Sequence, residues 1–253
     1  MKNGYVKSRV EENIGIIEFF HPKGNSLPGN LLSELTTQIK AFCTDNEVKV
    51  IILKSAGEKA FCAGASFDEL IKISNLEEGK KFFSGFGNVI NAMKTCPKFV
   101  IASVQGKAVG GGVGIISAAD YVIAVNSAMV RLSELTIGIA PFVIASSVEE
   151  KIGKAAFMEM TIDTEWKDSN WAYQKGLFTK LTNDYASLQE ETLKLANKLS
   201  NYSSLAVKEI KNIFWSNNIH REQEITLRAE LSGKLVLGKE AREFLDNFKK
   251  GNK

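Results

Sequence analysis

Two helix starts rich in small residues and one carboxylate among apolar neighbours are the places in this sequence where types and spacing could do chemistry. The first helix start lies at Gly110-Gly111-Gly112, directly after the apolar β-branched run Val100 to Val104 and a turn at Gly106. This order predicts a strand, a turn and a helix. The first amides of a helix have no partner within it, so they attract anions or developing negative charge.

The glycines match neither of two common phosphate-binding motifs. A dinucleotide fingerprint that starts at Gly110 would need a glycine at Ile115, and a P-loop that ends at Gly106-Lys107 would need one at Ile101. Three glycines are also compatible with tight packing of a helix on a strand, without any ligand. The stretch by itself therefore leaves both interpretations open.

The second helix start lies in the segment from Ala60 to Leu70. Ser66 is followed three residues later by Glu69, which predicts a capping box and a helix that starts just after Ala65. An oxyanion hole needs two converging N–H donors, and Ala65 and Gly111 are the natural candidates if the fold brings their loops together. The alternative is that both are ordinary capped helix starts.

The carboxylate is Glu134, which stands in the irregular apolar segment Met129 to Phe142. Removal from water raises the pKa of a carboxyl group and makes it a better general base or acid near neutrality. The alternative is a glutamate in a solvated loop.

Composition describes an ordinary globular protein of 253 residues, with 44% hydrophobic and 24% charged residues. A net charge of +3 is too small to indicate a nucleic-acid partner. The chain shows no signal peptide and no long apolar segment, and the odd set of cysteines at 43, 62 and 96 lacks metal-ligand spacing. We expect a cytoplasmic protein without membrane contact. His21 and His220 join no Cys/His cluster, so we expect no metal site.

The pattern along the chain predicts strands linked by helices, which is typical of an α/β fold with parallel strands. Predicted strands cover residues 14–20, 48–53, 100–104 and 121–125, and predicted helices cover 31–42, 75–95, 148–152, 155–161 and 171–177. From about Ser187 the sequence becomes polar and helical, without strand candidates. We therefore expect a core domain over residues 1–186 and a helical subdomain over 187–253.

Several of these features together resemble the crotonase, or enoyl-CoA hydratase/isomerase, superfamily. The similar segments are Ala60 to Leu70 (AFCAGASFDEL), Val109 to Gly114 (VGGGVG), Asp120 and Glu134 through Pro141. The resemblance covers nearly the whole chain. It implies a crotonase (ClpP/crotonase-like) spiral of ββα units with a C-terminal helical trimerisation region, and a homotrimer that can pair into a hexamer.

The resemblance also implies an acyl-CoA substrate and no separate cofactor, because the coenzyme A thioester is itself the substrate. The N–H groups of Ala65 and Gly111 would then hold the thioester oxygen, and Glu134 would be the acid–base group. The resemblance further implies that the C-terminal lysines could contact the nucleotide phosphates of coenzyme A. It also implies a set of residues that line the substrate channel: Lys23, Ala63, Ser66, Phe67, Gly110, Gly114 and Phe142.

Departures from the family pattern concern the reaction. In hydratases of this family a first glutamate lies three residues after the middle glycine, and the corresponding residue here is Gly114; the second glutamate is Glu134. Position 66, commonly Asp, is Ser. The pattern of a lone glutamate, with the run Gly138 to Phe142, resembles that of delta-3,delta-2-enoyl-CoA isomerases, so we expect isomerisation.

Other functions stay open at this stage. A hydratase could use Glu134 with Ser117, Glu69 or a water held by the backbone, and decarboxylation or thioester hydrolysis would use the same oxyanion hole. An acyl-CoA-binding protein without turnover is a further alternative. Phenylalanines 82, 83, 86 and 142 and Trp166 could shape an acyl pocket, although the first three have the spacing of core residues.

Overall fold

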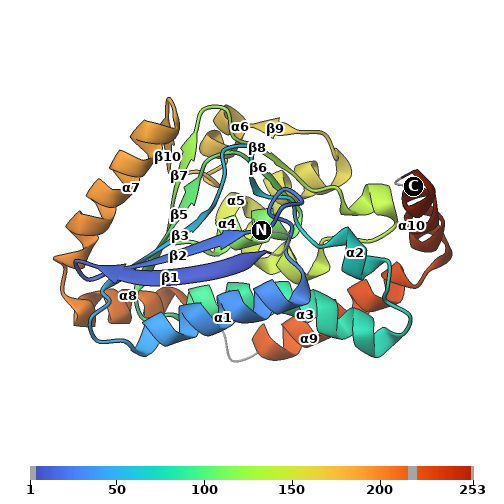
Figure 1. Ribbon diagram of the computed structural model, residues 1–253, viewed down its shortest axis with the longest axis horizontal. Coiled ribbons are helices and arrows are strands. Elements are labelled where there is room, and N and C mark those ends of the chain that lie inside the picture. Colours follow the sequence, from blue (N-terminus) through green and yellow to red (C-terminus); the bar gives the residue numbers. More distant parts are fainter. Residues whose placement is uncertain (1–3, 216–220, 252–253) are drawn as a thin grey trace.

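A six-stranded sheet and a four-stranded sheet form the centre of the computed structural model, which describes residues 4–215 and 221–251 (Figure 1). The large sheet has the order β1-β2-β3-β5-β7-β10, in which β1 and β2 are antiparallel and the other pairs are parallel. Its strands are β1 (Tyr5–Glu11), β2 (Ile14–Phe20), β3 (Val50–Ser55), β5 (Phe99–Val104), β7 (Tyr121–Val125) and β10 (Lys180–Thr182).

The small sheet has the order β4-β6-β8-β9, in which β4, β6 and β8 run parallel. Antiparallel pairing joins β8 to β9. Its strands are β4 (Ala60–Cys62), β6 (Lys107–Val109), β8 (Met129–Arg131) and β9 (Lys167–Asp168). These strands have two or three residues each, which is too short to show any periodicity in the sequence, and none of them was predicted.

Successive strands alternate between the two sheets and are followed by helices, so the chain advances as a spiral of ββα units. The pairs β3/β4, β5/β6 and β7/β8 each give one strand to the large sheet and one to the small sheet. The helices that follow these pairs are α2 (Phe67–Leu70) with α3 (Leu76–Thr95), α4 (Gly111–Ala118), and the 3₁₀ helix η1 (Glu134–Ile137) with α5 (Phe142–Ile162). The predicted α/β spiral is confirmed.

Most predicted elements of the first part of the chain are present, but the large sheet also contains strands that were not predicted, β1 and the three-residue β10. The strand β1 was not predicted, because it lies at the edge of the sheet and five of its seven residues are exposed. The two short helices predicted around residue 153 belong to α5, whose helical backbone breaks at Gly153 (φ 79°, ψ 155°). The predicted helix over residues 31–42 is α1 (Gly29–Thr44). The helix predicted over 171–177 is α6 (Ser169–Gln174), and Gly176, with φ +81°, follows its end as expected.

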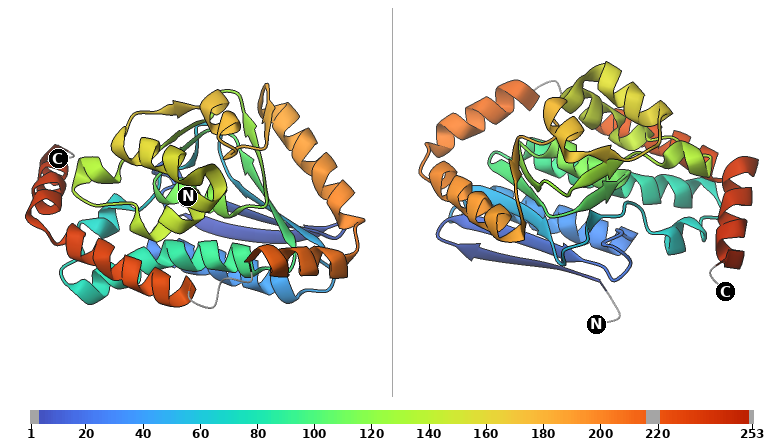
Figure 2. Two further views of the ribbon diagram at one scale, coloured as in Figure 1. Left: turned by 180° about the vertical axis from the view of Figure 1, so that it is seen from behind. Right: turned by 90° about the horizontal axis from the view of Figure 1, so that it is seen from above.

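Four helices complete the described chain: α7 (Tyr185–Ser200), α8 (Ser204–Trp215), α9 (Arg221–Val236) and α10 (Lys239–Gly251). They pack on the spiral at separate places. Helix α7 covers the large sheet, α9 runs beside α3, and α10 lies at the opposite end of the molecule from α7 (Figures 1 and 2). Helices α3 and α9 approach closely at Gly79 and Gly233, because neither residue has a side chain. A Cβ added to Gly79 would lie only 2.8 Å from the Cα of Gly233.

The structure also bears on the expectations for membrane segments, cysteines and the C-terminus. Within the two described ranges, no helix is both long and apolar enough to cross a membrane. The thiols of Cys43, Cys62 and Cys96 are free. His220 and the last two residues of the lysine-rich C-terminus lie outside the described residues.

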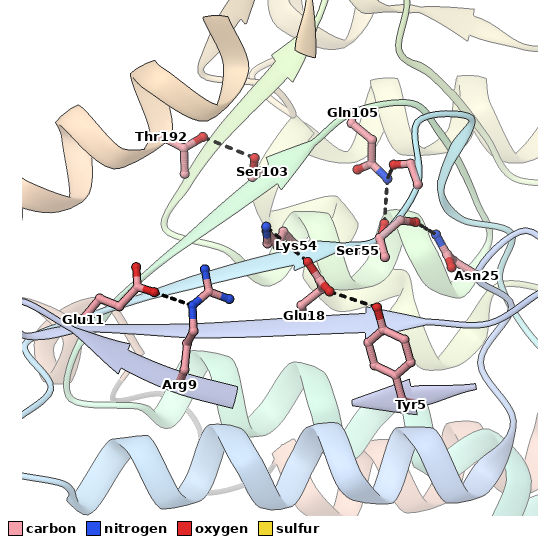
Figure 3. Close-up of polar contacts among 12 residues, drawn as sticks. Tyr5, Arg9, Glu11, Glu18, Asn25, Lys54, Ser55, Ser103, Gln105 and Thr192 are labelled. Carbon is pink, nitrogen blue, oxygen red and sulfur yellow. Dashed lines mark hydrogen bonds and ion pairs between the residues drawn. The ribbon is translucent and has the colours of Figure 1, made fainter. Parts of the chain in front are cut away.

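A buried polar network fixes the start of β4 against the large sheet (Figure 3). The side-chain amide of Gln105 donates to Ser55 Oγ at 2.8 Å and to the carbonyl of Ala60 at 3.0 Å. Asn25 donates to the same Ala60 carbonyl, also at 2.8 Å. Because both amides are nearly fully buried, each must find such partners, and β4 is held where they meet.

A buried ion pair joins α8 to the spiral. Lys211 Nζ lies 2.9 and 2.7 Å from the two carboxylate oxygens of Asp120, and the two side chains are only 3% and 14% exposed. Asp120 also accepts a hydrogen bond from the Val100 N–H at 2.8 Å. The pair therefore connects a C-terminal helix with the start of β5 and with the segment that links α4 to β7.

We predict that Asp120→Asn lowers the free energy of unfolding by about 3–5 kcal/mol, because it leaves a buried ammonium without the carboxylate charge. Urea denaturation at neutral pH measures the change. Glu230→Gln, which breaks a partly exposed pair with Lys234 one helical turn away, is the matched control and should cost less than about 1 kcal/mol. Equal losses in the two variants would contradict a stabilising role for the buried pair.

Candidate active site

The parallel strands β4, β6 and β8 end at the same edge of the small sheet, so the segments that follow them meet. These segments carry Ala65, Gly111 and Glu134, and all three line one cavity of about 90 Å³. The remaining lining is mostly apolar and comes from the same three segments and from α2, α3, α5 and α9. It includes Ala63, Gly64, Phe67, Leu70, Phe83, Phe86, Val109, Gly110, Ser133, Ile137, Ile139, Ala140, Pro141, Phe142, Val143, Ile144 and Ser232.

The loop that carries Ala65 is held against the chain on both sides. The Leu27 N–H donates to the Gly64 carbonyl at 2.8 Å, and the Ala63 N–H donates to the Gly24 carbonyl at 3.0 Å. Gly64 has φ +83°, and a Cβ there would lie 2.9 Å from the Val109 carbonyl oxygen. Only glycine allows this close approach, which brings the loop within reach of the start of α4.

The turn before α4 places a second amide beside the first. Gly110 adopts φ +53° and ψ −116°, and its own N–H donates to the Arg131 carbonyl at 2.9 Å. Gly111 is the first residue of α4, so its N–H has no partner within the helix. In the described part of the chain, neither the Gly111 N–H nor the Ala65 N–H donates a hydrogen bond. Both remain available to an oxygen atom in the cavity.

Glu134 opens η1 and lies directly against the Gly110 turn. A Cβ added to Gly110 would be 2.7 Å from Glu134 Oε1, so the carboxylate occupies the space that any larger residue at position 110 would need. The other oxygen, Oε2, is buried and has no hydrogen-bond partner among the described residues. Burial raises the pKa of the Glu134 carboxyl to about 7, although the backbone N–H groups of Ser133 and Glu134 favour the ionised form. The group can therefore accept and return a proton near neutral pH.

The cavity holds one ionisable side chain from the described chain, that of Glu134. The two other groups considered as catalytic partners lie elsewhere. Ser117 Oγ bonds the Gly114 carbonyl at 2.7 Å and Ser147 Oγ at 2.8 Å, and Glu69 Oε2 accepts from the Gly29 N–H at 2.7 Å. Among the described residues, no group of three His, Cys, Asp or Glu side chains could hold a metal ion.

The predicted capping box is wrong. Ser66 is the residue before α2, but its side chain makes no capping hydrogen bond. Glu69 instead reaches the start of α1, where Gly29 presents an unpaired N–H. A helix start elsewhere in the fold competes with the local cap, and α2 has only four residues to stabilise.

The structure brings together most, but not all, of the residues considered for the site. Ala63, Phe67, Gly110 and Phe142 line the cavity with the two amides and Glu134. Three other residues do not line it. Lys23 is exposed and pairs with Asp68 at 2.6 Å, Ser66 is buried beside the loop, and Gly114 lies behind the side chain of Ile144.

The proposed acyl-pocket aromatic residues are divided in the same way. Phe83, Phe86 and Phe142 line the cavity, whereas Phe82 faces a separate groove between α1 and α3. Trp166 lies outside it, with Lys107 Nζ 5.0 Å from its ring centroid.

Apart from Phe142, sequence reasoning missed the wall formed by α5 and α9. Val143 and Ile144 stand at the start of α5, before the first of the two helices that the sequence predicted there. Ser232 of α9 is fully buried at the cavity, and its hydroxyl bonds the Arg228 carbonyl at 3.0 Å. The apolar run Val143-Ile144 was a signal for α5, but nothing local to Ser232 marks it as a residue of the site.

Comparisons with known proteins agree on the family and the fold. The family model described as "Enoyl-CoA hydratase/isomerase" matches residues 9–252. The short-chain-enoyl-CoA hydratase of Clostridium acetobutylicum is 30% identical over 200 residues, which are 78% of this chain and 76% of that protein. The crystal structure of an enoyl-CoA hydratase from Bacillus halodurans has the same fold, with a TM-score of 0.89, 21% identity, and coverage of 96% of this chain and 99% of that one. An enoyl-CoA hydratase from Bacillus anthracis has a TM-score of 0.78 at 26% identity, with 97% and 96% covered.

We predict that Glu134→Gln changes the pH dependence of stability. The folded pKa of about 7 lies above the ordinary value of 4.5, so the unfolded chain releases this proton first as pH rises. Below pH 4.5 the protonated group does not destabilise the fold. Between pH 4.5 and 7 the free energy of unfolding of the wild type should fall by on the order of 3 kcal/mol because of this group, and above pH 7 that loss should stay constant. Glu134→Gln removes this loss.

Urea denaturation of both proteins from pH 5 to pH 8 measures the effect as a difference, so that contributions of other groups cancel. The same substitution at the exposed Glu149 of α5 is the matched control. A difference between wild type and Glu134→Gln that is the same at pH 5 and pH 8 would contradict the burial of this carboxylate.

Proposed function

We propose that this chain, which belongs to the enoyl-CoA hydratase/isomerase family, shifts the double bond of an enoyl-CoA thioester by proton transfer through Glu134. The observation that carries the proposal is a lone buried carboxylate that shares an apolar cavity with two unpaired N–H groups. One group that takes and returns a proton, and two donors for an oxyanion, are the parts that such an isomerisation requires.

The reaction divides into two proton transfers. The ionised Glu134 removes a proton from C2 of a 3-enoyl-CoA, and the electron pair of the C–H bond moves into the conjugated system to form a dienolate. The N–H groups of Ala65 and Gly111 donate to the negative thioester oxygen, and one such donor contributes roughly 3 kcal/mol to lowering the barrier in other enzymes. Glu134 then gives the proton to C4, which leaves the double bond between C2 and C3. The step is redox-neutral and uses no cofactor.

The environment of Glu134 suits this role. A base that must return its proton to a neighbouring carbon needs a pKa close to the working pH, and burial raises the pKa of Glu134 to about 7. The surrounding wall is apolar, with Ile137, Ile139 and Ile144 among its members, which favours retention of the proton on the carboxyl rather than its loss to water.

Hydration of a 2-enoyl-CoA is the second candidate, because a relative that is 30% identical carries the name short-chain-enoyl-CoA hydratase. It would require Glu134 to activate a water molecule with help from the backbone, since the side chains of Ser117 and Glu69 are engaged outside the cavity. A protein that binds acyl-CoA without turnover would show neither reaction.

The coenzyme A portion of the substrate would extend from the cavity along the loop at Lys23. Gly24 lies next to Ala63, with 3.4 Å between the Ala63 Cβ and a Cβ built on Gly24, so this loop borders a residue of the cavity lining. Lys23 is exposed and can reach a phosphate by giving up its surface pair with Asp68, which is worth less than about 1 kcal/mol.

We predict that the purified protein converts 3-hexenoyl-CoA into the conjugated 2-enoyl thioester and does not hydrate crotonyl-CoA. Absorbance of the conjugated enoyl thioester follows both reactions. Glu134→Gln should reduce isomerisation by about 10²- to 10⁴-fold, because the amide cannot accept the proton. The wild-type rate should rise with pH through about 7 as the carboxyl ionises.

The control for this loss is Glu149→Gln, which alters a glutamate on the exposed side of α5 and should leave the rate unchanged. Hydration of crotonyl-CoA without isomerisation would exclude the proposal in favour of the hydratase. Binding of acyl-CoA with no reaction would favour the binding protein.

We also propose that the helical region forms the subunit contact of a homotrimer, which can pair into a hexamer. Large apolar side chains are exposed on α8 and α9, among them Leu205, Phe214 and Leu227 at 69%, 74% and 59%. Replacing Phe214 and Leu227 by Glu should shift the mass measured by light scattering toward the monomer. A wild-type protein that is monomeric at micromolar concentration would contradict this proposal.

A further inference from the structure

The side chain of Ile144 lies where a side chain on Gly114 would have to be. A Cβ added to Gly114 would be 2.4 Å from Ile144 Cγ2 and 2.7 Å from its Cβ, and 3.2 Å from Ile90 Cδ1. Ile144 is 3% exposed and borders the cavity, whereas Gly114 does not. The absence of a side chain at position 114 thus gives Ile144 its place in the wall.

A hydrogen bond joins helices α4 and α5 one turn beyond Gly114 and Ile144. Ser117 of α4 and Ser147 of α5 are each three residues beyond Gly114 and Ile144, and their hydroxyls are 2.8 Å apart. Both serines are 2% exposed, and Ser117 also bonds the Gly114 carbonyl. This contact holds α5 against α4, so Ile144 cannot easily move away from the cavity.

The position of this contact relates it to the reacting atoms. Gly114 lies one turn beyond the start of α4, since its N–H donates to the Gly110 carbonyl at 3.2 Å. Gly110 in turn touches the Glu134 carboxylate, and Gly111 presents one of the two unpaired N–H groups. Ile144 therefore lies against the first turn of α4 and lines the cavity that Glu134 also lines.

We propose that Ile144 is a specificity-determining residue that keeps water away from Glu134 and the substrate, so that the proton returns to carbon and no hydroxyl is added. This inference rests on the proposed isomerisation. A smaller residue at 144 would open the cavity toward the hydroxyls of Ser117 and Ser147, and these polar groups would suit a water molecule in the cavity that Glu134 also lines.

Water beside Glu134 has two measurable chemical consequences. The carboxyl proton taken from C2 would exchange with solvent before its return, so the product formed in D₂O would carry deuterium at C4. A water activated by Glu134 could also add to C3 of a 2-enoyl-CoA, with its proton passing to the carboxylate and then to C2. Both changes follow from access to water and not from loss of the base.

The test compares wild type, Ile144→Ala and Val148→Ala. Val148 is a fully buried residue on the same helix that does not line the cavity, so its truncation is the matched control. In D₂O with 3-hexenoyl-CoA, mass spectrometry measures deuterium at C4, and a parallel assay measures hydration of 2-hexenoyl-CoA. We expect the ratio of hydration to isomerisation to rise about tenfold or more in Ile144→Ala, with clear uptake of deuterium, and neither change in Val148→Ala.

A wild type that does not isomerise 3-hexenoyl-CoA would overturn the proposed function itself. A wild type that isomerises, together with an Ile144→Ala variant that takes up no more deuterium than Val148→Ala, would overturn the role of Ile144 alone. Equal increases in both variants would also overturn it, because they would reflect general loosening of α5.

A second measurement does not depend on activity. Gly114→Ala should lower the melting temperature of the wild type, because the new methyl group overlaps Ile144. It should lower that of Ile144→Gly much less, since glycine removes both the Cγ2 and the Cβ that lie within 2.7 Å. Equal shifts in the two backgrounds would show that Ile144 is not seated on Gly114 and would contradict the inference.

Discussion

The close approach of three chain segments around Gly110 is the constraint on which the site depends. Glycine at this position permits both a positive φ and contact with Glu134 Oε1, which any side chain would displace. Gly64 makes the corresponding approach to the Val109 carbonyl. The glycines at these two positions therefore let two amides and one carboxylate share a cavity. The parallel strands β4, β6 and β8 place all three at the same edge of the small sheet.

The same packing raises the pKa of the Glu134 carboxyl at the expense of stability. One oxygen of Glu134 is buried without a partner, and a buried unpaired charge is unfavourable, so the pKa rises until the proton is held near neutrality. An active site is a place where such a conflict is useful. In the proposed isomerisation, the apolar wall that causes it, including Ile144, would also keep water from the carboxylate, as the transfer of a proton between two carbons requires.

The C-terminal helices contribute to the site as well as to the outside of the molecule. Ser232 of α9 lines the cavity, and α9 reaches it because Gly79 and Gly233 let the helices cross closely. The ring of Phe67, another lining residue, packs on Phe248 of α10 with 4.9 Å between centroids. Helix α9 thus adds Ser232 to the cavity wall, and α10 covers the ring of Phe67.

The sequence by itself determined the main strands and helices, both helix starts that are rich in small residues, and Glu134 as the candidate base. These features depend on periodicity and on residue types at short spacing, which act locally. Tertiary structure alone decided that Glu69 bonds Gly29 rather than capping its own helix, that strands of two or three residues form a second sheet, and that Ile144 fills the space above Gly114. Each of these depends on atoms that are far apart along the chain and meet only in the folded protein, where packing at a few tenths of an ångström selects one arrangement.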